Sequence, residues 1–193
     1  MTPPEPDFLT PNIADLRSAL HDAFGFSELR AGQREAIEAV MAGRNVLAVM
    51  PTGSGKSLCY QLPAIVRGGL TVVVSPLVAL MRDQVAALRL NDIAAATINS
   101  DLSREENVRT WYAVRDGYVR LLYLSPERLM TDRMLAALEK LDVDLFAIDE
   151  AHCISQWGPA FRPEYAMLAD LRTRFPGTPI IGLTATADGA TRE

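Results

Sequence analysis

The sequence predicts an α/β fold built on a parallel β-sheet. Short apolar runs alternate with helical apolar patterns along most of the 193 residues, an alternation typical of parallel strands joined by crossover helices. Polar residues follow several of these runs, and ligands of such sheets bind beyond the carboxyl ends of the strands. The clearest case is Gly-Ser-Gly-Lys-Ser at 53–57, directly after an apolar run. We therefore expect a helix-flanked parallel sheet with a phosphate-binding edge.

Composition narrows the class of protein. The chain is 49% hydrophobic and 22% charged, which is ordinary for a folded domain with its own core. Its formal net charge is −5, so any contact with nucleic acid must come from local residues. Its two cysteines, Cys59 and Cys153, lack disulfide or zinc spacing and are expected to be reduced thiols. No apolar run is long enough to span a membrane, so we expect a cytoplasmic protein without a membrane partner.

The N-terminal part predicts a tail followed by two helices. Residues 1–11 hold four prolines and two acids and are expected to form a flexible tail. Asn12 can cap a helix that ends at Gly25, and a second helix is expected to stop at Gly43. We assign residues 12–193 to one domain.

The remaining elements follow in a regular order. Strands are expected at 46–50, 71–75, 94–98, 120–125, 144–149 and 179–184, and the first is expected to be buried on both faces. Helices are expected from Leu58, at 77–90, after a Ser103–Glu106 capping box, at 127–141 and at 164–175. Pro63 is expected to shorten or kink the helix from Leu58. Another helix is expected after Asp188, so we interpret the sequence as the first part of a longer protein.

The run at 51–57 has the residue types that bind phosphates. Gly53 and Gly55 permit a tight turn that points backbone N–H groups inward, and the following helix adds its N-terminal partial positive charge. Lys56 can reach the outer phosphates, and the Ser57 hydroxyl can bind Mg²⁺. The full motif has glycine where this chain has Met50. The alternative is a glycine-rich surface turn that happens to carry a lysine.

A second candidate group is the acidic pair after the fifth strand. Asp149 is placed to hold Mg²⁺, and Glu150 is placed to orient or deprotonate an attacking water. Each role requires negative charge or basicity, which an amide lacks. The alternative is a solvated acidic turn.

Several motifs together resemble a superfamily 2 helicase: Pro-Thr-Gly-Ser-Gly-Lys-Ser at 51–57, Asp-Glu-Ala-His at 149–152 and Thr-Ala-Thr at 184–186. Methionine at position 50 is also typical of that group. Three further stretches, at 24–33, 75–84 and 151–165, resemble motif 0, motif Ia and the aromatic-rich loop of the RecQ DNA helicases. The resemblance covers residues 12–193 and implies the first RecA-like P-loop NTPase lobe of a two-lobe enzyme.

The resemblance implies how ATP is bound. Gln33 would read the adenine edge, because a carboxamide can both accept and donate hydrogen bonds there. Arg30 and Phe26 would flank the base. The Thr52 hydroxyl would support the loop that also contains Ser54. Without the resemblance, Gln33 would rather be interpreted as an exposed residue in the first turn of a helix.

The resemblance also assigns residues to DNA and to its coupling with hydrolysis, namely Ser75, Pro76, Trp157, Phe161, Arg162, Thr184 and Thr186. The aromatic and arginine side chains at 157–162 suit stacking on single-strand bases and pairing with phosphate, unless that loop is tucked into the core. His152 is expected to contact either the second lobe or the Thr-Ala-Thr segment. Pro159 and Ala160 replace the family's usual His-Asp, so coupling here is expected to differ.

The expected function is that of an ATP- and Mg²⁺-dependent DNA helicase lobe. By resemblance, the enzyme would move 3′ to 5′ on single-stranded and forked DNA in repair or recombination, with a second lobe that this sequence lacks. The alternatives are an RNA helicase lobe of the same superfamily and a non-catalytic nucleotide-binding module. A small-molecule kinase is disfavoured because it has no need of the 157–162 loop. The oligomeric state is left open.

Overall fold

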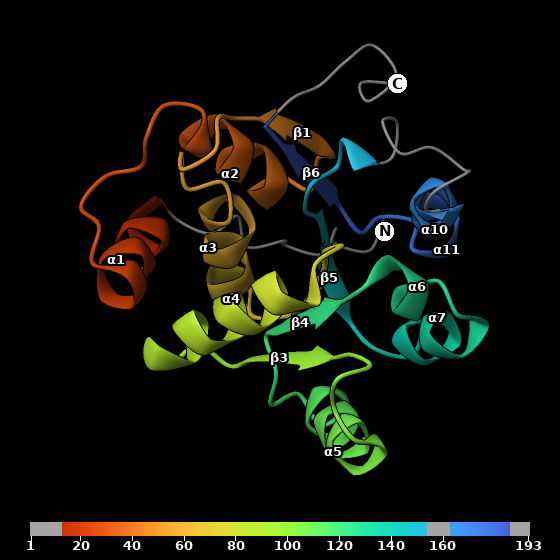
Figure 1. Ribbon diagram of the computed structural model, residues 1–193. Helices are drawn as coiled ribbons and strands as arrows, with labels where there is room; N and C mark the ends of the chain where they lie inside the picture. Colours follow the sequence, from red (N-terminus) through yellow and green to blue (C-terminus); the bar gives the residue numbers. More distant parts are fainter. Residues whose placement is uncertain (1–12, 154–162, 186–193) are drawn as a thin grey trace, which may run out of the picture.

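A single parallel sheet organises the molecule (Figure 1). The computed structural model describes residues 13–153 and 163–185. Its strands are β1 (Val46–Val49), β2 (Leu70–Val74), β3 (Ala95–Ile98), β4 (Leu121–Leu124), β5 (Val143–Ile148) and β6 (Ile180–Thr184). They pair in the order β1-β6-β5-β2-β4-β3, and every pairing is parallel. The predicted α/β fold is confirmed, and each strand lies within one residue of its expected bounds.

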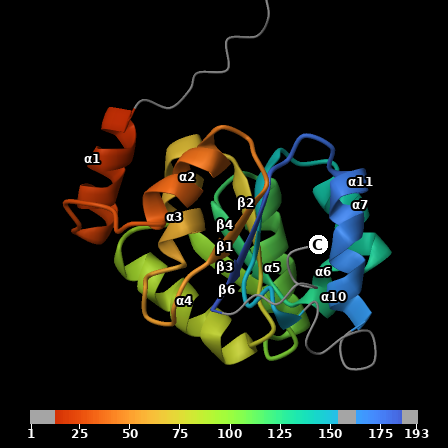
Figure 2. The same cartoon turned by 90° about the horizontal axis from the view of Figure 1, so that it is seen from above.

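Helices cover both faces of this sheet (Figure 2). One layer holds α1 (Ile13–Phe24), α2 (Gln33–Met41), α3 (Leu58–Arg67) and α4 (Val78–Leu90). The other holds α5 (Arg104–Arg115), α6 (Pro126–Leu129), α7 (Asp132–Leu138), α10 (Pro163–Met167) and α11 (Leu171–Arg174), with a short 3₁₀ turn η1 (Leu168–Asp170) before α11. None of the helices in the described segments is long and apolar enough to cross a membrane.

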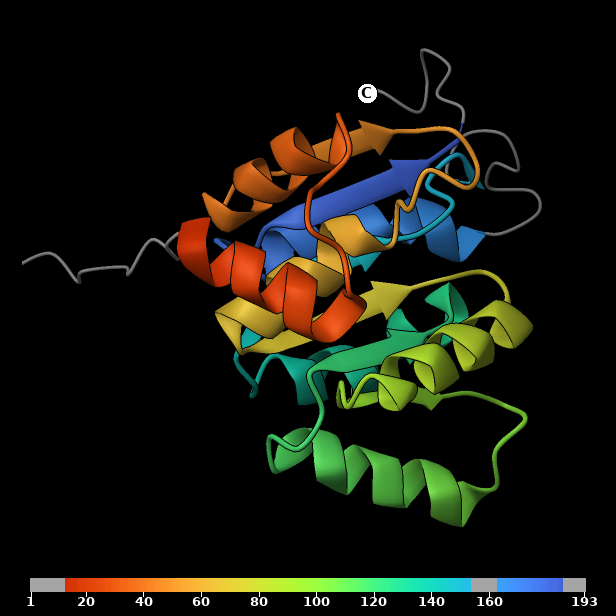
Figure 3. The same cartoon turned by 90° about the vertical axis from the view of Figure 1, so that its left-hand side faces the viewer.

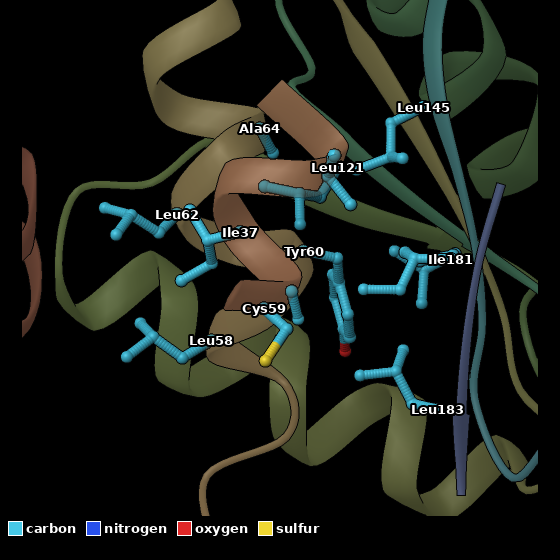
Figure 4. Packing of buried hydrophobic residues seen from close by; sticks show 14 of the residues in the cluster. Ile37, Leu58, Cys59, Tyr60, Leu62, Ala64, Leu121, Leu145, Ile181 and Leu183 are labelled. Atoms are coloured by element: carbon cyan, nitrogen blue, oxygen red, sulfur yellow. The ribbon is translucent and has the colours of Figure 1, made fainter. Parts of the chain in front are cut away.

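The strands divide their side chains between two cores. In β2, Val73 joins the core under α1–α4, whereas Val72 and Val74 join the core on the opposite face. This follows from the two-residue repeat of a strand, which sends successive side chains to opposite faces. Figure 4 shows the first core, where the Tyr60 ring lies between α3 and the β6 residues Ile181 and Leu183. Burial on both faces explains why the central strands are continuous apolar runs.

Strand β1 corrects one expectation. We expected it to be buried on both faces, but Leu47 is 39% exposed and Val49 is 45% exposed. The strand lies at the sheet edge, and its Ala48 packs in the core beside α2 and α3. No β1 residue belongs to the second core of the described chain. The apolar run was read correctly as a strand, but its edge position was not visible in the sequence.

The predicted helix at 127–141 is also wrong as a single element. It is two short helices, α6 and α7, separated at Met130 and Thr131. The Thr131 hydroxyl accepts a bond from the Met134 backbone N–H at 3.3 Å and donates to the Arg128 carbonyl at 3.1 Å. Thr131 is therefore an N-cap that starts a new helix, as a threonine side chain can.

Two helices also differ from their expected extents. Helix α3 continues through Pro63 to Arg67, so the proline does not end it. Pro63 lacks the N–H that would bond to the Cys59 carbonyl, and Leu62 and Ala64 on either side of it are buried in the core. Leu77 is the exposed N-cap residue of α4 and is not part of its buried face.

Candidate nucleotide-binding site

Three of the predicted motifs meet at one edge of the sheet. All strands point the same way (Figure 3), so the segments that follow β1, β6, β5 and β2 emerge side by side. Backbone bonds tie these ends together: Met50 N–H donates to the Thr184 carbonyl at 2.9 Å, and Asp149 N–H donates to the Val74 carbonyl at 2.8 Å. Three separate sequence motifs are thereby held in fixed positions.

The loop after β1 requires its two glycines. Gly53 and Gly55 have φ of 77° and 79°, in the left-handed region that side chains disfavour. A Cβ on Gly55 would also lie 2.7 Å from Gln33 Nε2. The loop leads into α3, whose N-terminal partial positive charge favours an anion at this position. The geometry is that of a phosphate-binding loop.

The segment at 30–33 is bonded to this loop. Arg30 Nη1 donates to the Gly53 carbonyl at 3.2 Å, and Gln33 Nε2 donates to the Ser54 and Gly55 carbonyls at 3.1 Å each. Gln33 Oε1 accepts from the Arg30 backbone N–H at 2.8 Å. Two motifs separated by about twenty residues thus form one unit.

Gln33 and Phe26 differ in how much of each side chain is exposed. Gln33 is 3% exposed, so the alternative of an exposed first-turn residue is wrong. The nitrogen of its carboxamide bonds the backbone of the phosphate loop, and the oxygen accepts from the Arg30 N–H of its own segment. Phe26 is 52% exposed, which leaves its ring free to pack against a planar group. That this group is adenine remains a prediction.

The acidic pair after β5 is asymmetric. Asp149 is 7% exposed, and burial, with a further contribution from the Glu150 charge, raises its pKa to about 6. The Glu150 backbone N–H, which donates to Asp149 Oδ1 at 3.0 Å, and the Lys56 charge act in the opposite direction. A buried carboxyl group whose pKa lies close to neutral pH does not fit the solvated acidic turn considered above.

Glu150 has an unusual backbone. Its φ is 51°, which is rare for a residue other than glycine. Such conformations are strained and are often found at functional sites. Nothing in the sequence indicated this strain.

His152 joins the acidic turn to the end of β6. Its Nδ1 lies 3.1 Å from Thr184 Oγ1 and 3.3 Å from Glu150 Oε2. Of the two contacts expected for His152, the structure therefore shows the one with the Thr-Ala-Thr segment. Thr184 itself is fully buried.

Two oxygen donors could hold Mg²⁺ here. Ser57 follows Lys56 at the start of α3, and the Lys56 charge acts on Asp149 at the end of β5, so both candidate ligands belong to the same edge of the sheet. Mg²⁺ prefers oxygen and takes few protein ligands when nucleotide phosphates supply the others. The donor set fits that ion bound together with a nucleotide.

Comparison with known proteins decides the family. The DEAD/DEAH box helicase family matches residues 30–193. This chain belongs to the DEAD/DEAH box helicase family. Within it, the resemblance to RecQ helicases is confirmed, since the chain is 49% identical to the ATP-dependent DNA helicase RecQ of Pasteurella multocida (strain Pm70) and 48% identical to that of Haemophilus influenzae (strain ATCC 51907 / DSM 11121 / KW20 / Rd). These matches cover 90% and 91% of the chain but 28% of each relative.

Solved structures support the same fold. The crystal structure of the helicase MrfA bound to DNA and AMPPNP matches with a TM-score of 0.72 at 23% identity, over 97% of this chain and 28% of that one. A hypothetical ATP-dependent RNA helicase from Sulfolobus tokodaii matches with a TM-score of 0.70 at 20% identity, over 93% and 52%. These likenesses show that the helicase lobe has a RecA-like fold.

Only part of the set assigned to DNA lies in the described chain. Ser75 and Pro76 are buried at the end of β2, and Ser75 Oγ has no hydrogen-bond partner among the described residues. The others, apart from Thr184, lie outside the described residues: Trp157, Phe161, Arg162 and Thr186. The same holds for Pro159 and Ala160 and for the expected tail at 1–11.

The structure adds residues that the sequence did not single out. Tyr60, Tyr123 and Gln84 form a hydrogen-bonded group directly beneath Ser57. They come from α3, β4 and α4, so no sequence spacing connects them. The available signal was Gln84 itself, because it ends the stretch at 75–84 that resembles motif Ia.

A groove of about 920 Å³ lies elsewhere, between α5 and the α6–α7 pair. Its lining includes Trp111 and Tyr112 of α5 and Arg128 and Arg133 of the opposite side. None of the predicted site residues lines it. The nucleotide site is therefore defined by hydrogen bonds and charge at the sheet edge and is separate from this groove.

Proposed function

We propose that this chain is the ATP-binding lobe of a 3′-to-5′ DNA helicase of RecQ type. The observation that carries the proposal is the pairing of the glycine loop with a buried acid: Lys56 follows the loop, and its charge acts on Asp149 at the end of β5. A phosphate loop and a carboxylate at one sheet edge form the site at which P-loop proteins bind nucleotide and Mg²⁺.

Each loop residue has a role in binding ATP. The backbone N–H groups of Gly53 to Ser57 bind the phosphates, with Ser54 inside the loop and Thr52 supporting it. Lys56 neutralises the outer phosphates. Phe26 and Arg30 flank the base, and Gln33 reads its edge or fixes the loop that lies beneath it. Exposure of Phe26 and the three bonds from Arg30 and Gln33 to the loop support this arrangement.

The acidic turn carries the hydrolytic step. Ser57 and Asp149 would hold Mg²⁺, which supplies charge neutralisation at the phosphates when bound. Glu150 orients the attacking water and accepts its proton. His152 is held by Glu150 on one side and Thr184 on the other, so the position of Glu150 is linked to the end of β6.

The DNA side of the proposal rests on similarity. We infer that Ser75, Pro76, Trp157, Phe161, Arg162, Thr184 and Thr186 contact single-stranded or forked DNA or transmit its binding. A second RecA-like lobe closes the site and supplies an arginine finger, which is worth about 10³ to 10⁵ in rate. A role in DNA repair or recombination follows from the same similarity. Residues 12–193 are the first domain of that enzyme.

The test is phosphate release from ATP with and without single-stranded DNA. The 193-residue chain is compared with a longer protein extended through roughly 200 following residues, about one more domain. We expect the chain alone to bind nucleotide weakly and hydrolyse it poorly, because the arginine finger is absent. The longer protein should show DNA-stimulated turnover that Lys56→Ala abolishes and that Lys140→Ala, the change of an exposed lysine, leaves intact.

Three results would overturn parts of this proposal. Appreciable hydrolysis by the chain alone, lost in Lys56→Ala, would show that one lobe suffices. A strict requirement for RNA would favour an RNA helicase. Turnover in neither protein, with nucleotide binding retained, would favour a non-catalytic module and direct attention to Pro159 and Ala160.

A further inference from the structure

Beneath the phosphate loop lies a buried hydrogen-bonded group that the proposed chemistry does not use. Gln84 Oε1 accepts from the Tyr60 hydroxyl at 2.6 Å and from the Tyr123 hydroxyl at 3.0 Å. The two hydroxyls lie 3.3 Å apart, and the rings pack edge to face at 6.5 Å. Gln61 Nε2 donates to the Tyr123 hydroxyl at 3.4 Å. Both tyrosines are almost completely buried, so their hydroxyls depend on these partners.

The two tyrosines determine how the Gln84 amide is oriented. A carboxamide oxygen only accepts hydrogen bonds, and its nitrogen only donates them. Tyrosine hydroxyls carry their protons at neutral pH, and both of these lie within hydrogen-bonding distance of Oε1, an atom that can only accept. Because both donate to Oε1, the Gln84 amide nitrogen must point the other way.

That nitrogen points toward Ser57. Gln84 Nε2 lies 3.5 Å from Ser57 Oγ, with the nitrogen as donor. An N–H donated to Ser57 Oγ occupies one of its lone pairs and leaves the other free. Gln84 also belongs to α4, whose N-terminus follows Ser75 and Pro76. The bond thus links the loop to an element on another side of the site.

We propose that Gln84 is a positioning residue that holds the Ser57 hydroxyl in the orientation needed to bind nucleotide-associated Mg²⁺. This inference rests on the proposed function, because it takes Ser57 as a ligand. Tyr60 and Tyr123 hold Gln84 in turn, so the metal ligand is supported by groups from α3, α4 and β4. Partners that orient a metal ligand typically change metal affinity by about 10- to 100-fold when they are removed.

The test measures Mg²⁺ affinity through nucleotide binding and does not require turnover. Binding of a fluorescent ADP analogue to the 193-residue chain is titrated with Mg²⁺ and repeated in excess chelator. Gln84→Leu should raise the Mg²⁺ concentration for half-maximal binding about 10-fold. Affinity in chelator should stay unchanged, because the contacts of the loop with phosphate do not involve Gln84. A merely structural role would weaken both.

Two further variants keep the inference testable. Gln61→Leu removes an amide from the same hydrogen-bonded group. The Gln61 side chain has no hydrogen bond to Ser57, and the bond from its backbone N–H to the Ser57 carbonyl does not depend on the side chain, so the Mg²⁺ titration of this variant should match that of the wild type. Gln84→Glu keeps the acceptor for both tyrosines and loses the donor to Ser57, and it serves if the leucine variant fails to fold. Unfolding temperatures establish which variants are folded.

The outcomes separate the two proposals. If the wild type shows no Mg²⁺-dependent nucleotide binding, the proposed function fails at this chain. If the wild type shows Mg²⁺-dependent nucleotide binding, and both folded Gln84 variants need the same Mg²⁺ concentration for half-maximal binding, only the role of Gln84 is refuted. Equal effects of Gln61→Leu and Gln84→Leu would also refute it.

Discussion

Asp149 shows how one residue changes character between sequence and structure. In the sequence it is one of two adjacent acids after an apolar run. In the structure it is 7% exposed and carries a pKa of about 6, mainly because it is buried. Its neighbour Glu150 is half-exposed and bonded to His152. The two acids therefore occupy different environments, which suits different tasks.

The raised pKa predicts how the stability of the nucleotide-free chain depends on pH. Since the folded-state pKa lies above that of an unfolded aspartate, an ionised Asp149 disfavours the native state. This cost grows as pH rises from about 4 and is complete above about 6. Asp149→Asn should thus raise the free energy of unfolding more at about pH 8 than at about pH 4.5, by on the order of 2 kcal/mol.

Urea denaturation at the two pH values, without Mg²⁺, measures this difference. Asp83→Asn, which removes an exposed carboxylate on α4, reports the effect of losing a surface charge. A pH-independent effect of Asp149→Asn would contradict the raised pKa of Asp149.

The same carboxyl must be ionised to bind a cation, so we also expect Mg²⁺-dependent nucleotide affinity to fall as the pH drops through about 6.

At the scale of the element, one helix start was predicted from the sequence and another was missed. The capping box at the start of α5 was expected from Ser103 and Glu106, and both bonds are present: Ser103 Oγ accepts from Glu106 N–H at 3.2 Å and Ser103 N–H donates to Glu106 Oε2 at 2.8 Å. These bonds lower the pKa of Glu106. The break at Thr131 was missed because the apolar pattern continues across it.

The cap of α5 gives a prediction at this scale. Ser103→Ala should lower the free energy of unfolding by about 1 kcal/mol, because the Glu106 N–H loses its acceptor. Ser103→Asp keeps an acceptor and should change it by only a few tenths of a kcal/mol. Urea denaturation distinguishes the two. Equal destabilisation by both substitutions would show that the side-chain cap contributes nothing.

At the scale of the whole molecule, the position of an apolar residue in the sheet decides how much it contributes to the stability of the fold. Leu183 of β6 is fully buried between the two helical layers, whereas Leu47 of the neighbouring β1 is 39% exposed. The two strands are directly paired, and both residues are leucines in apolar runs. Only their places in the sheet distinguish them.

This difference predicts unequal costs of truncation. Leu183→Ala should lower the free energy of unfolding by about 2 to 5 kcal/mol, because it leaves a cavity in a packed core. Leu47→Ala should lower it by less than about 1 kcal/mol. Chemical denaturation of the two variants beside the wild type measures both. A cost for Leu47→Ala as large as that for Leu183→Ala would mean that the exposed face of β1 is covered in solution.

The sequence by itself determined the fold class and the positions of the strands, and it predicted the residues of the site. It could do so because apolar strand runs, helix caps and the phosphate loop each depend on residues that are close in the chain. Gly53, Gly55 and Lys56 are informative without any knowledge of the fold. Asp149 and Glu150 needed only the expectation that strand ends meet at one edge.

Only the tertiary structure decided how these groups act on each other. The edge position of β1, the burial of Gln33, the strained backbone of Glu150 and the support of Ser57 by Gln84 all depend on contacts between distant segments. Burial and hydrogen-bond partners are properties of the packed molecule. Local sequence patterns carry no direct record of them, because the same residue types occur in exposed turns and helices.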